Sequence, residues 1–438
     1  MPALNIAYTR HTLPNGLDIL IHEDHNCPIV AVNIWYHVGS KNEKPGRTGF
    51  AHLFEHLMFE GSQHYDKGYF QPLQEAGGSL NGSTNADRTN YWEVVPTNAL
   101  DLALWMESDR MGYLLPALTA AKFQNQLEVV LNERRQNYEN RPYGFAGMAI
   151  LSTMYPPDHP YHWLTIGSAD DLRASTLEEV HAFFKTYYRP RNASLALAGD
   201  VDTDRALALV EDYFGELESG DPPPPVEFSA PPPLTSEIRL ILEDRIELPR
   251  VYLAFHSPGL FQPDDAELDL VADVLSGGKT SRLYRSLVYE QRVATEVAAS
   301  QNSREIGSFF QIVATAAPGR TLSEVERAIT GEMSKLLAEG PTQDEMDRCM
   351  AQAEAHFVFR LQTVGGFGGK SDQLNAYNVF LNEPGFFDHD LARYKQATPA
   401  SLRAAANKWL TAGRVVLSIV PRGRREMALT GSQPVTVS

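Results

Sequence analysis

The sequence predicts an α+β protein made of two similar domains, each a mixed β-sheet with helices packed against it. A proline-rich stretch divides the 438-residue chain near its middle. Strands and helices are predicted in the same order on both sides of it. Hydrophobic residues make up 43% of the chain and charged residues 21%, which supplies material for two buried cores and argues against a largely disordered chain.

The dividing stretch, residues 216–233, contains seven prolines. Proline lacks a backbone N–H donor and favours extended polyproline geometry, so this segment is predicted to be a semi-rigid linker. The predicted organisation is therefore an N-terminal domain over 1–217, a linker over 218–235 and a homologous C-terminal domain over 236–438.

The predicted elements of the two halves correspond in order. Each half begins with an apolar strand followed by a helix. These lie at 29–36 and 48–59 in the first half, and at 250–256 and 265–275 in the second half. A strand and a long helix follow, at 90–95 and 98–111 in the first half, and at 308–316 and 322–339 in the second half. Each half ends with a helix and then a strand, at 177–188 and 193–198 in the first half, and at 399–410 and 415–420 in the second half. Because sequence identity between the halves is low, the repeat rests on this order alone.

Charge and hydropathy exclude several classes of protein. The chain has 38 Lys+Arg and 55 Asp+Glu, a net charge of −17. This charge repels phosphate backbones, so nucleic acid is not an expected partner. No apolar run approaches the ~20 residues of a membrane span. The first residues lack the pattern of a signal peptide, which predicts a cytoplasmic protein, or a periplasmic one if such a peptide was removed before Met1.

The residues that carry chemistry lie on the helix predicted over 48–59. His52, Glu55 and His56 are spaced i, i+3 and i+4, which places them on one face of a helix. Most of the other residues are apolar, so the helix is predicted to be largely buried, and buried polar side chains need partners. A zinc ion held by His52 and His56 would provide one, with Glu55 beside it to take a proton from a bound water.

The alternative is two core histidines that flank a glutamate by coincidence. With 13 His in 438 residues, an H-x-x-E-H motif is expected by chance on the order of 0.03 times per chain. The motif therefore favours a metal site over a purely structural role. The two cysteines, Cys27 and Cys349, lack the CxxC neighbours that a thiolate zinc site needs.

A catalytic zinc needs a third protein ligand and an open position. A helix predicted over 120–138 offers two acids, of which Glu133 is separated from His56 by 76 residues. An H-x-x-E-H motif followed at this distance by a glutamate resembles the inverzincin zinc peptidases, the family of pitrilysin, insulin-degrading enzyme and mitochondrial processing peptidase. Further segments along nearly the whole chain support the resemblance, at 13–17, 59–62, 77–82 and 277–283.

The resemblance implies a fold and a role for individual residues. The two domains would form half of a clam-shell, as in the zinc-bearing subunit of a two-chain bacterial member. His52, His56 and Glu133 would bind one Zn²⁺ per chain. Glu55 would deprotonate the zinc-bound water that attacks the scissile carbonyl, and would then pass the proton to the leaving amine. The substrates would be peptides or unfolded polypeptides.

The sequence departs from the family at two places. Many relatives carry a glutamate seven residues before the third ligand, where this chain has Gln126, which can hydrogen-bond but brings no charge. Active single-chain relatives also carry an Arg and a Tyr seven residues apart in the C-terminal half. On a helix predicted over 286–295, those positions hold Val288 and Thr295.

Without that pair, the chain is predicted to carry only the metal half of an active site. A homologous second subunit would supply the Arg and the Tyr, so a heterodimer is the expected assembly. A self-sufficient homodimer is an alternative that would need Tyr289 and Arg292 to substitute, although their order and spacing differ. A non-catalytic structural or assembly subunit of the same fold is another alternative, against which the intact H-x-x-E-H motif argues.

Substrate is expected to bind at a sheet edge. Residues 80–94 alternate in polarity and are predicted to end at such an edge, where an extended peptide can add as a further strand. Asn81 is the side-chain candidate for contacting the peptide near the scissile bond. The alternative is that Asn81 and Gly82 only form a turn, as this dipeptide often does. Relatives usually have Ala where Gly82 stands.

Overall fold

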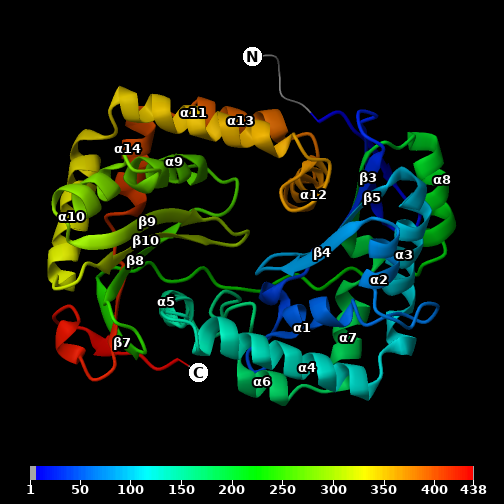
Figure 1. The fold of residues 1–438 in the computed structure, drawn as a ribbon, viewed down its shortest axis with the longest axis horizontal. Helices are drawn as coiled ribbons and strands as arrows, with labels where there is room; N and C mark the ends of the chain where they lie inside the picture. The colour runs from blue at the N-terminus through cyan, green and yellow to red at the C-terminus, as the bar shows by residue number, and fades with distance from the viewer. Residues whose placement is uncertain (1–5, 438) are drawn as a thin grey trace. The chain divides into compact units, whose positions relative to one another are not determined.

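A computed structural model describes residues 6–437 and divides the chain into two compact units (Figure 1). Unit 1 comprises Met1–Arg134, Trp163–Phe228 and His356–His389, and unit 2 comprises Arg135–His162, Ser229–Ala355 and Asp390–Ser438. Each unit has a six-stranded mixed sheet with helices against it. The predicted α+β class with two similar domains is confirmed.

The division into units departs from the continuous boundaries predicted for the domains. Residues 135–162 belong to unit 2 although they precede the linker, and residues 356–389 belong to unit 1 although they follow it. Residues 218–235 form neither helix nor strand, in keeping with the proline content of this segment.

The sheet of unit 1 has the strand order β1-β2-β6-β3-β5-β4. Its strands are β1 (Thr9–Thr12), β2 (Asp18–Glu23), β3 (Ile29–Tyr36), β4 (Ser79–Thr84), β5 (Thr89–Pro96) and β6 (Ala193–Gly199). β2 and β6 are parallel, and the other neighbours are antiparallel. β4 ends the order beside β5, in a register from Ser79↔Val94 to Thr84↔Thr89. The edge predicted for the region 80–94 is therefore β4.

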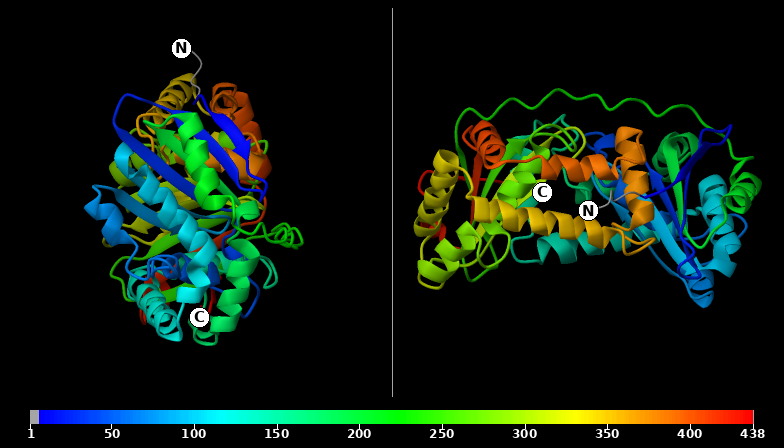
Figure 2. Two further views of the ribbon diagram at one scale, coloured as in Figure 1. Left: turned by 90° about the vertical axis from the view of Figure 1, so that its right-hand side faces the viewer. Right: turned by 90° about the horizontal axis from the view of Figure 1, so that it is seen from above.

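Helices cover both faces of this sheet (Figure 2). α3 (Leu100–Ala117) contacts β3 and β5, and α8 (Thr203–Phe214) contacts β2. α12 (Lys370–Leu381), which comes from the C-terminal half of the sequence, contacts β2, β3 and β6. Side chains on a strand alternate between the two faces. Arg110 of α3 pairs with Glu93, whereas Asp372 of α12 accepts from Trp35, so α3 and α12 lie on opposite faces.

The remaining helices of unit 1 pack on the edge strand β4 or on one another. They are α1 (Phe50–Leu57), α2 (Phe70–Glu75), α4 (Ala120–Arg134), α6 (Ala169–Arg173) and α7 (Leu177–Tyr187). α1 contacts β4, α4 and α7. The helix predicted to carry the metal motif therefore lies beside the edge strand predicted to bind substrate.

The sheet of unit 2 has the strand order β12-β7-β11-β8-β10-β9. Its strands are β7 (Ile238–Asp244), β8 (Arg250–Ser257), β9 (Ala294–Asn302), β10 (Ser308–Ala316), β11 (Val415–Pro421) and β12 (Gln433–Pro434). Five strands in this order repeat those of unit 1, with β7, β11, β8, β10 and β9 in the places of β2, β6, β3, β5 and β4. The structural repeat predicted from element order is therefore present.

Helices complete the core of unit 2. The further helices are α5 (Ala146–Met154), α9 (Asp265–Ser276), α10 (Leu322–Glu339) and α14 (Pro399–Trp409). α11 (Gln343–Arg360) and α13 (Phe387–Lys395) contribute residues to both units. α9, α10 and α14 enclose a hydrophobic core with the sheet, and α5 contacts β11.

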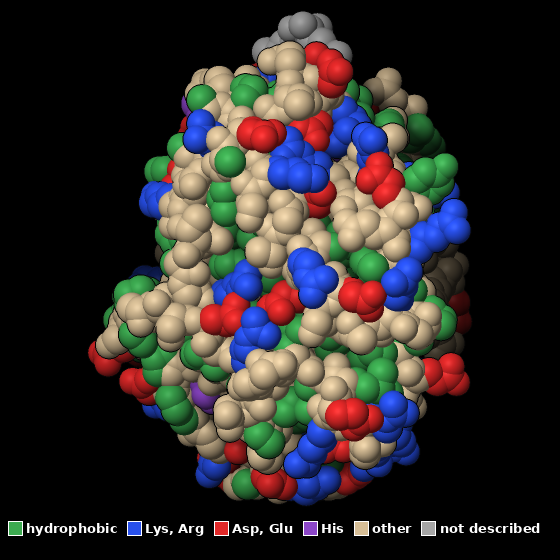
Figure 3. Space-filling view, turned by 90° about the vertical axis from the view of Figure 1, so that its left-hand side faces the viewer, with side chains coloured by type: hydrophobic (Ala, Val, Ile, Leu, Met, Phe, Trp, Pro, Cys, Tyr) green, Lys and Arg blue, Asp and Glu red, His purple; other side chains and the backbone are tan. Residues whose placement is uncertain are grey.

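Lys and Arg side chains lie interspersed with Asp and Glu on the face drawn in Figure 3.

The helix predicted over 286–295 is wrong in its second half. The helical segment spans Tyr284–Glu290, and β9 begins at Ala294. Arg292 adopts a left-handed backbone with φ of 54°, which an ordinary helix does not accommodate. Thr295 is therefore a strand residue.

Within the part of the chain that the structure describes, no helix combines the length and the apolar character needed to cross a membrane.

Candidate metal centre

α1 begins at a sharp turn that is held by a buried carboxylate. Gly49 has φ of 90°, a left-handed conformation that glycine adopts without a steric penalty. The carboxylate of Glu43 accepts hydrogen bonds from the backbone N–H groups of Gly49, at 3.0 Å, and Ala51, at 2.8 Å. Glu43 therefore satisfies donors that the first turn of a helix leaves without partners. Burial raises the pKa of Glu43 to about 8.

The apolar side of α1 fixes its rotation. Leu53, Phe54 and Leu57 are fully buried, and the Phe54 ring stacks on the rings of Phe184 and Tyr188. Since these side chains occupy the buried face, His52, Glu55 and His56 lie together on the half-exposed face. The helical face predicted from the i, i+3, i+4 spacing is therefore the one observed.

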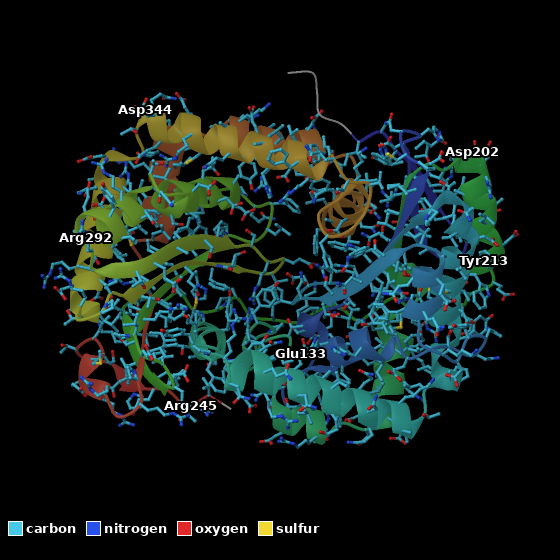
Figure 4. The ribbon with its side chains drawn as sticks, in the orientation of Figure 1. Glu133, Asp202, Tyr213, Arg245, Arg292 and Asp344 are labelled. Atoms are coloured by element: carbon cyan, nitrogen blue, oxygen red, sulfur yellow. The ribbon has the colours of Figure 1, made fainter. Side chains whose placement is uncertain are left out.

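Glu133 lies on α4 (Figure 4), and α4 packs against α1, which carries the two histidines. The Glu133 Oε2 atom lies 3.6 Å from His52 Nε2 and 3.4 Å from His56 Nε2. One ligand atom from each of these residues lies within 4.8 Å of the others. Within residues 6–437, no other group of three or more His, Cys, Asp or Glu side chains brings its ligand atoms this close together. The structure thus brings together the three predicted ligands.

The spacing of the three side chains fits a tetrahedral metal. Two ligands bound at about 2.0–2.1 Å in tetrahedral geometry lie about 3.3 Å apart, close to the two distances between nitrogen and oxygen observed here. Two imidazoles and a carboxylate are also a ligand set that zinc uses when a fourth position stays open. Burial and the neighbouring His56 lower the pKa of His52 to about 4, so this imidazole is neutral, as a metal ligand must be.

The packing of α4 against the start of α1 places Glu133. Arg134 is buried, and its Nε atom donates to the carbonyl of Gly167 at 3.2 Å. Ser168, next along the chain, donates from its backbone N–H to Thr48 Oγ1 at 2.9 Å. One loop therefore holds both the end of α4 and the residue before Gly49.

Glu55 lies on the same face as the ligands and points toward the edge strand. The Thr84 hydroxyl of β4 and the Arg88 guanidinium both favour the charged form of the Glu55 carboxyl, and each lowers its pKa. Burial nevertheless raises the pKa of Glu55. A carboxylate with a raised pKa binds a proton more readily, which suits a general base.

Arg88 was not among the residues expected from the sequence. Its guanidinium lies 5.0 Å above the Trp35 ring and donates to the Ser83 carbonyl at 2.9 Å. Asp372 of α12 and Glu55 are both close enough to influence its charge. The sequence signal for Arg88 is a single basic residue between β4 and β5. Two of the carboxylates that influence its charge, Glu55 and Asp372, come from α1 and α12, which are distant from it along the chain.

Gln126 lies two turns before Glu133 on α4 and faces another acid. Its side-chain amide donates to the carboxylate of Glu60. The position that holds a supporting glutamate in many relatives is therefore used here to bind a nearby carboxylate.

Asn81 and Gly82 lie within β4, so the alternative that they form a turn is wrong. Asn81 is exposed, and its Oδ1 atom accepts from the Gly82 N–H at 2.8 Å. A Cβ atom at Gly82 would lie 3.0 Å from the Tyr91 ring and 3.2 Å from the Phe59 ring. An alanine at this position would therefore press against both rings.

Val288 and Thr295, which stand where active single-chain relatives carry Arg and Tyr, belong to unit 2. Val288 packs against the hydrophobic core, and Thr295 Oγ1 donates to the Thr315 carbonyl at 3.4 Å. Tyr289 is 74% exposed, and Arg292 is also exposed, at the rim of the unit (Figure 4). Neither Val288 nor Thr295 offers a cation or a phenol.

Comparisons with known proteins agree with this site. A family model described as insulinase (peptidase family M16) matches residues 18–159, and one described as the peptidase M16 inactive domain matches residues 174–353. The chain is 29% identical over 367 residues to the zinc protease PqqE of Helicobacter pylori, covering 82% of this chain and 81% of that protein. It is 26% identical to a probable mitochondrial-processing peptidase subunit beta of Arabidopsis thaliana, covering 74% of this chain and 62% of that protein.

Solved structures show the same fold. The crystal structure of a protease from Helicobacter pylori matches with a TM-score of 0.87 at 26% identity, over 95% of this chain and 100% of that one. The peptidase M16 inactive domain from Pseudomonas fluorescens matches with a TM-score of 0.84 at 19% identity, over 98% and 100% of the two chains. From the fold, the two matched domains and the named zinc proteases among its relatives, the chain belongs to the pitrilysin and insulinase family of M16 zinc peptidases.

Proposed function

We propose that this chain is the zinc-bearing subunit of an endopeptidase that hydrolyses peptides or unfolded polypeptides. One Zn²⁺ per chain would be held by His52, His56 and Glu133. The convergence of these three side chains beside Glu55 carries the proposal. Relatives named zinc proteases support it as well.

The side chains of this site divide the work of hydrolysis. A bound zinc ion would polarise the peptide carbonyl and lower the pKa of a water molecule. Glu55 would accept a proton from the water as its oxygen bonds to the carbonyl carbon. The same carboxyl would then give the proton to the amide nitrogen as the C–N bond breaks. The Thr84 hydroxyl, which favours the charged form of Glu55, would help to orient this carboxylate during both transfers.

The open edge of β4 would hold the substrate. An extended peptide can pair with the backbone N–H and C=O groups that an edge strand leaves available. Because Thr84 at the end of β4 contacts Glu55, a peptide paired with β4 would pass the catalytic carboxylate. Asn81, exposed on the same strand, would contact the peptide near the scissile bond.

A homologous second subunit would complete the active site. Peptide hydrolysis places negative charge on the carbonyl oxygen, and donors aimed at that oxygen speed the reaction. The positions for such donors hold Val288 and Thr295 in this chain. We therefore propose a heterodimer whose partner contributes an Arg and a Tyr.

The test is hydrolysis of a quenched fluorescent peptide by this chain together with its partner, with Glu55→Gln as the matched control. The proposal predicts activity that 1,10-phenanthroline removes, that added Zn²⁺ restores, and that the Glu55→Gln protein lacks. Activity that is unchanged in the Glu55→Gln protein would contradict the proposed function.

A further inference from the structure

A pocket of about 650 Å³ lies at the end of β4 farthest from Glu55. The sheet contributes Ser79, Ile29, Trp92 and Val94, and the segment 361–366 contributes the opposite wall. All of these residues belong to unit 1. The walls are mainly apolar, and Trp92 is the largest side chain among them.

The pairing of the strands shows which way the pocket faces. Ser79 pairs with Val94, and Asn81 pairs with Trp92, so these side chains share the face of the sheet that carries α12. Ser79 is also exposed and lies on the edge strand. A further strand added to β4 would therefore direct alternate side chains toward this pocket.

The segment that closes the pocket is fitted closely to the sheet. A Cβ atom on Gly365 would lie 2.5 Å from Ala31 Cβ and 2.6 Å from Val94 Cγ2, so the backbone approach requires glycine. Phe367 meets Trp92 edge to face, with ring centroids 5.4 Å apart. The wall is thus held against β3 and β5 by packing.

Charge favours an uncharged occupant. Two charged side chains line the pocket, Asp24 and Lys370. They form an ion pair of 2.5 Å, and each side chain is about 15% exposed. Since the two charges neutralise each other, the lining attracts neither an acidic nor a basic side chain.

We propose that this pocket binds a bulky apolar side chain of the substrate, such as Phe or Leu, about five residues from the scissile bond. Thr84 lies five positions after Ser79, which at the rise of a β-strand is about 17 Å. A peptide paired with β4 covers the same distance with the same number of residues. This inference rests on the proposed peptidase function and adds a substrate preference to it.

Cys27 provides a direct test, because it is exposed and lines the pocket. Cys349 is buried, and burial raises the pKa of its thiol to about 11, so a thiol reagent distinguishes the two. The probes are two 14-residue peptides, one with a single Phe and one with Ala in its place. With Glu55→Gln protein, which leaves the peptides intact, the rate of Cys27 alkylation by iodoacetamide is measured against peptide concentration.

The Phe peptide should protect Cys27 at about tenfold to hundredfold lower concentration than the Ala peptide, the difference expected from burying one aromatic side chain. Ser79→Trp, which fills the pocket from the edge strand, should abolish this difference. Thr9→Trp is the matched control, because it places the same side chain on β1 at the other edge of the sheet, and it should keep the difference.

Cleavage by the wild-type complex tests the spacing. When Phe is moved along the peptide, the cleaved bond should move with it and stay about five residues away. Equal protection of Cys27 by both peptides, or a difference that persists in Ser79→Trp, would overturn the pocket proposal even if Glu55-dependent hydrolysis is found. Protection without any hydrolysis would instead leave the pocket in place and contradict the peptidase function.

Discussion

His52, Glu55 and His56 share one face of α1 because helical spacing requires it, and this placement could be predicted from three positions in the sequence. Glu133 is different. Its partnership with the histidines depends on how α4 packs on α1, and only resemblance to a family indicated it beforehand. Arg88 was missed for the same physical reason, since its neighbours Glu55 and Asp372 come from distant elements.

Replacement of Glu55 by Gln should remove hydrolysis and keep the metal. The amide matches the carboxylate in size but cannot accept the proton, and loss of a general base commonly costs about 10²–10⁴-fold in rate. The measurement is kcat for a quenched peptide in the assembled enzyme, with metal content determined on the same preparation. A Glu55→Gln enzyme within tenfold of the wild-type kcat would show that another group is the base.

At the level of elements, the strands were predicted more closely than the helix ends. β3 was predicted at the residues where it occurs, because a mostly apolar run of this length marks a buried strand. The helix predicted over 286–295 failed because the left-handed residue Arg292 has no distinctive sequence signal. The role of Glu43 at the start of α1 was also missed, since it lies six residues before the glycine it binds.

Loss of the Glu43 cap should weaken α1 before any metal is bound. Glu43→Ala leaves the N–H groups of Gly49 and Ala51 without their acceptor, which should cost about 1–2 kcal/mol of unfolding free energy. Glu43→Gln keeps an acceptor oxygen and should lose less. Urea unfolding in excess EDTA measures this effect without contributions from zinc. Equal stability of Glu43→Ala and wild type would contradict the capping role.

Stability should also depend on pH through Asp269 of α9. Burial raises the pKa of Asp269 to about 7, and its carboxyl accepts a hydrogen bond from Tyr394 at 2.7 Å. Between pH 4 and 7 the folded state keeps a proton that the unfolded state has lost, so this group's contribution to stability falls as pH rises. Asp269→Asn cannot titrate and still accepts from Tyr394.

The comparison to make is the unfolding free energy of wild type minus that of Asp269→Asn. This difference should decrease by on the order of 2–4 kcal/mol from pH 4 to pH 7. A difference that stays constant or increases over this range would show that Asp269 titrates normally in the folded protein.

At the level of the whole molecule, the repeat of the sheet could be predicted from the sequence. The placement of residues 135–162 in unit 2 and of residues 356–389 in unit 1 could not. Element order shows that both halves build the same sheet, but it does not show which face of a sheet each helix covers. α12 joins unit 1 through polar contacts, among them Asp372 with Trp35 and Asn375 with the Asn33 carbonyl. α5 joins unit 2 beside β11. The polar face of α12 carries little hydrophobic periodicity from which its place could be predicted.

The isolated chain should be nearly inactive, and a homologous partner should restore turnover. A missing donor to the carbonyl oxygen costs about 10²–10³-fold in rate, and two donors are missing at Val288 and Thr295. The measurement is peptide hydrolysis by the purified chain, by the partner, and by their mixture. Mutation of the partner's Arg or Tyr should abolish the gain. Full turnover by the verified monomer or homodimer would contradict the two-chain account.

The central claim is that His52, His56 and Glu133 form a zinc site, and metal content tests it most directly. Wild-type protein dialysed against zinc and then against metal-free buffer should retain about one zinc per chain by mass spectrometry of the metal. His56→Ala, whose folding is checked by circular dichroism, should retain less than about a tenth of that amount, while Glu55→Gln retains all of it. Zinc at full occupancy in His56→Ala, or none in wild type, would contradict the account.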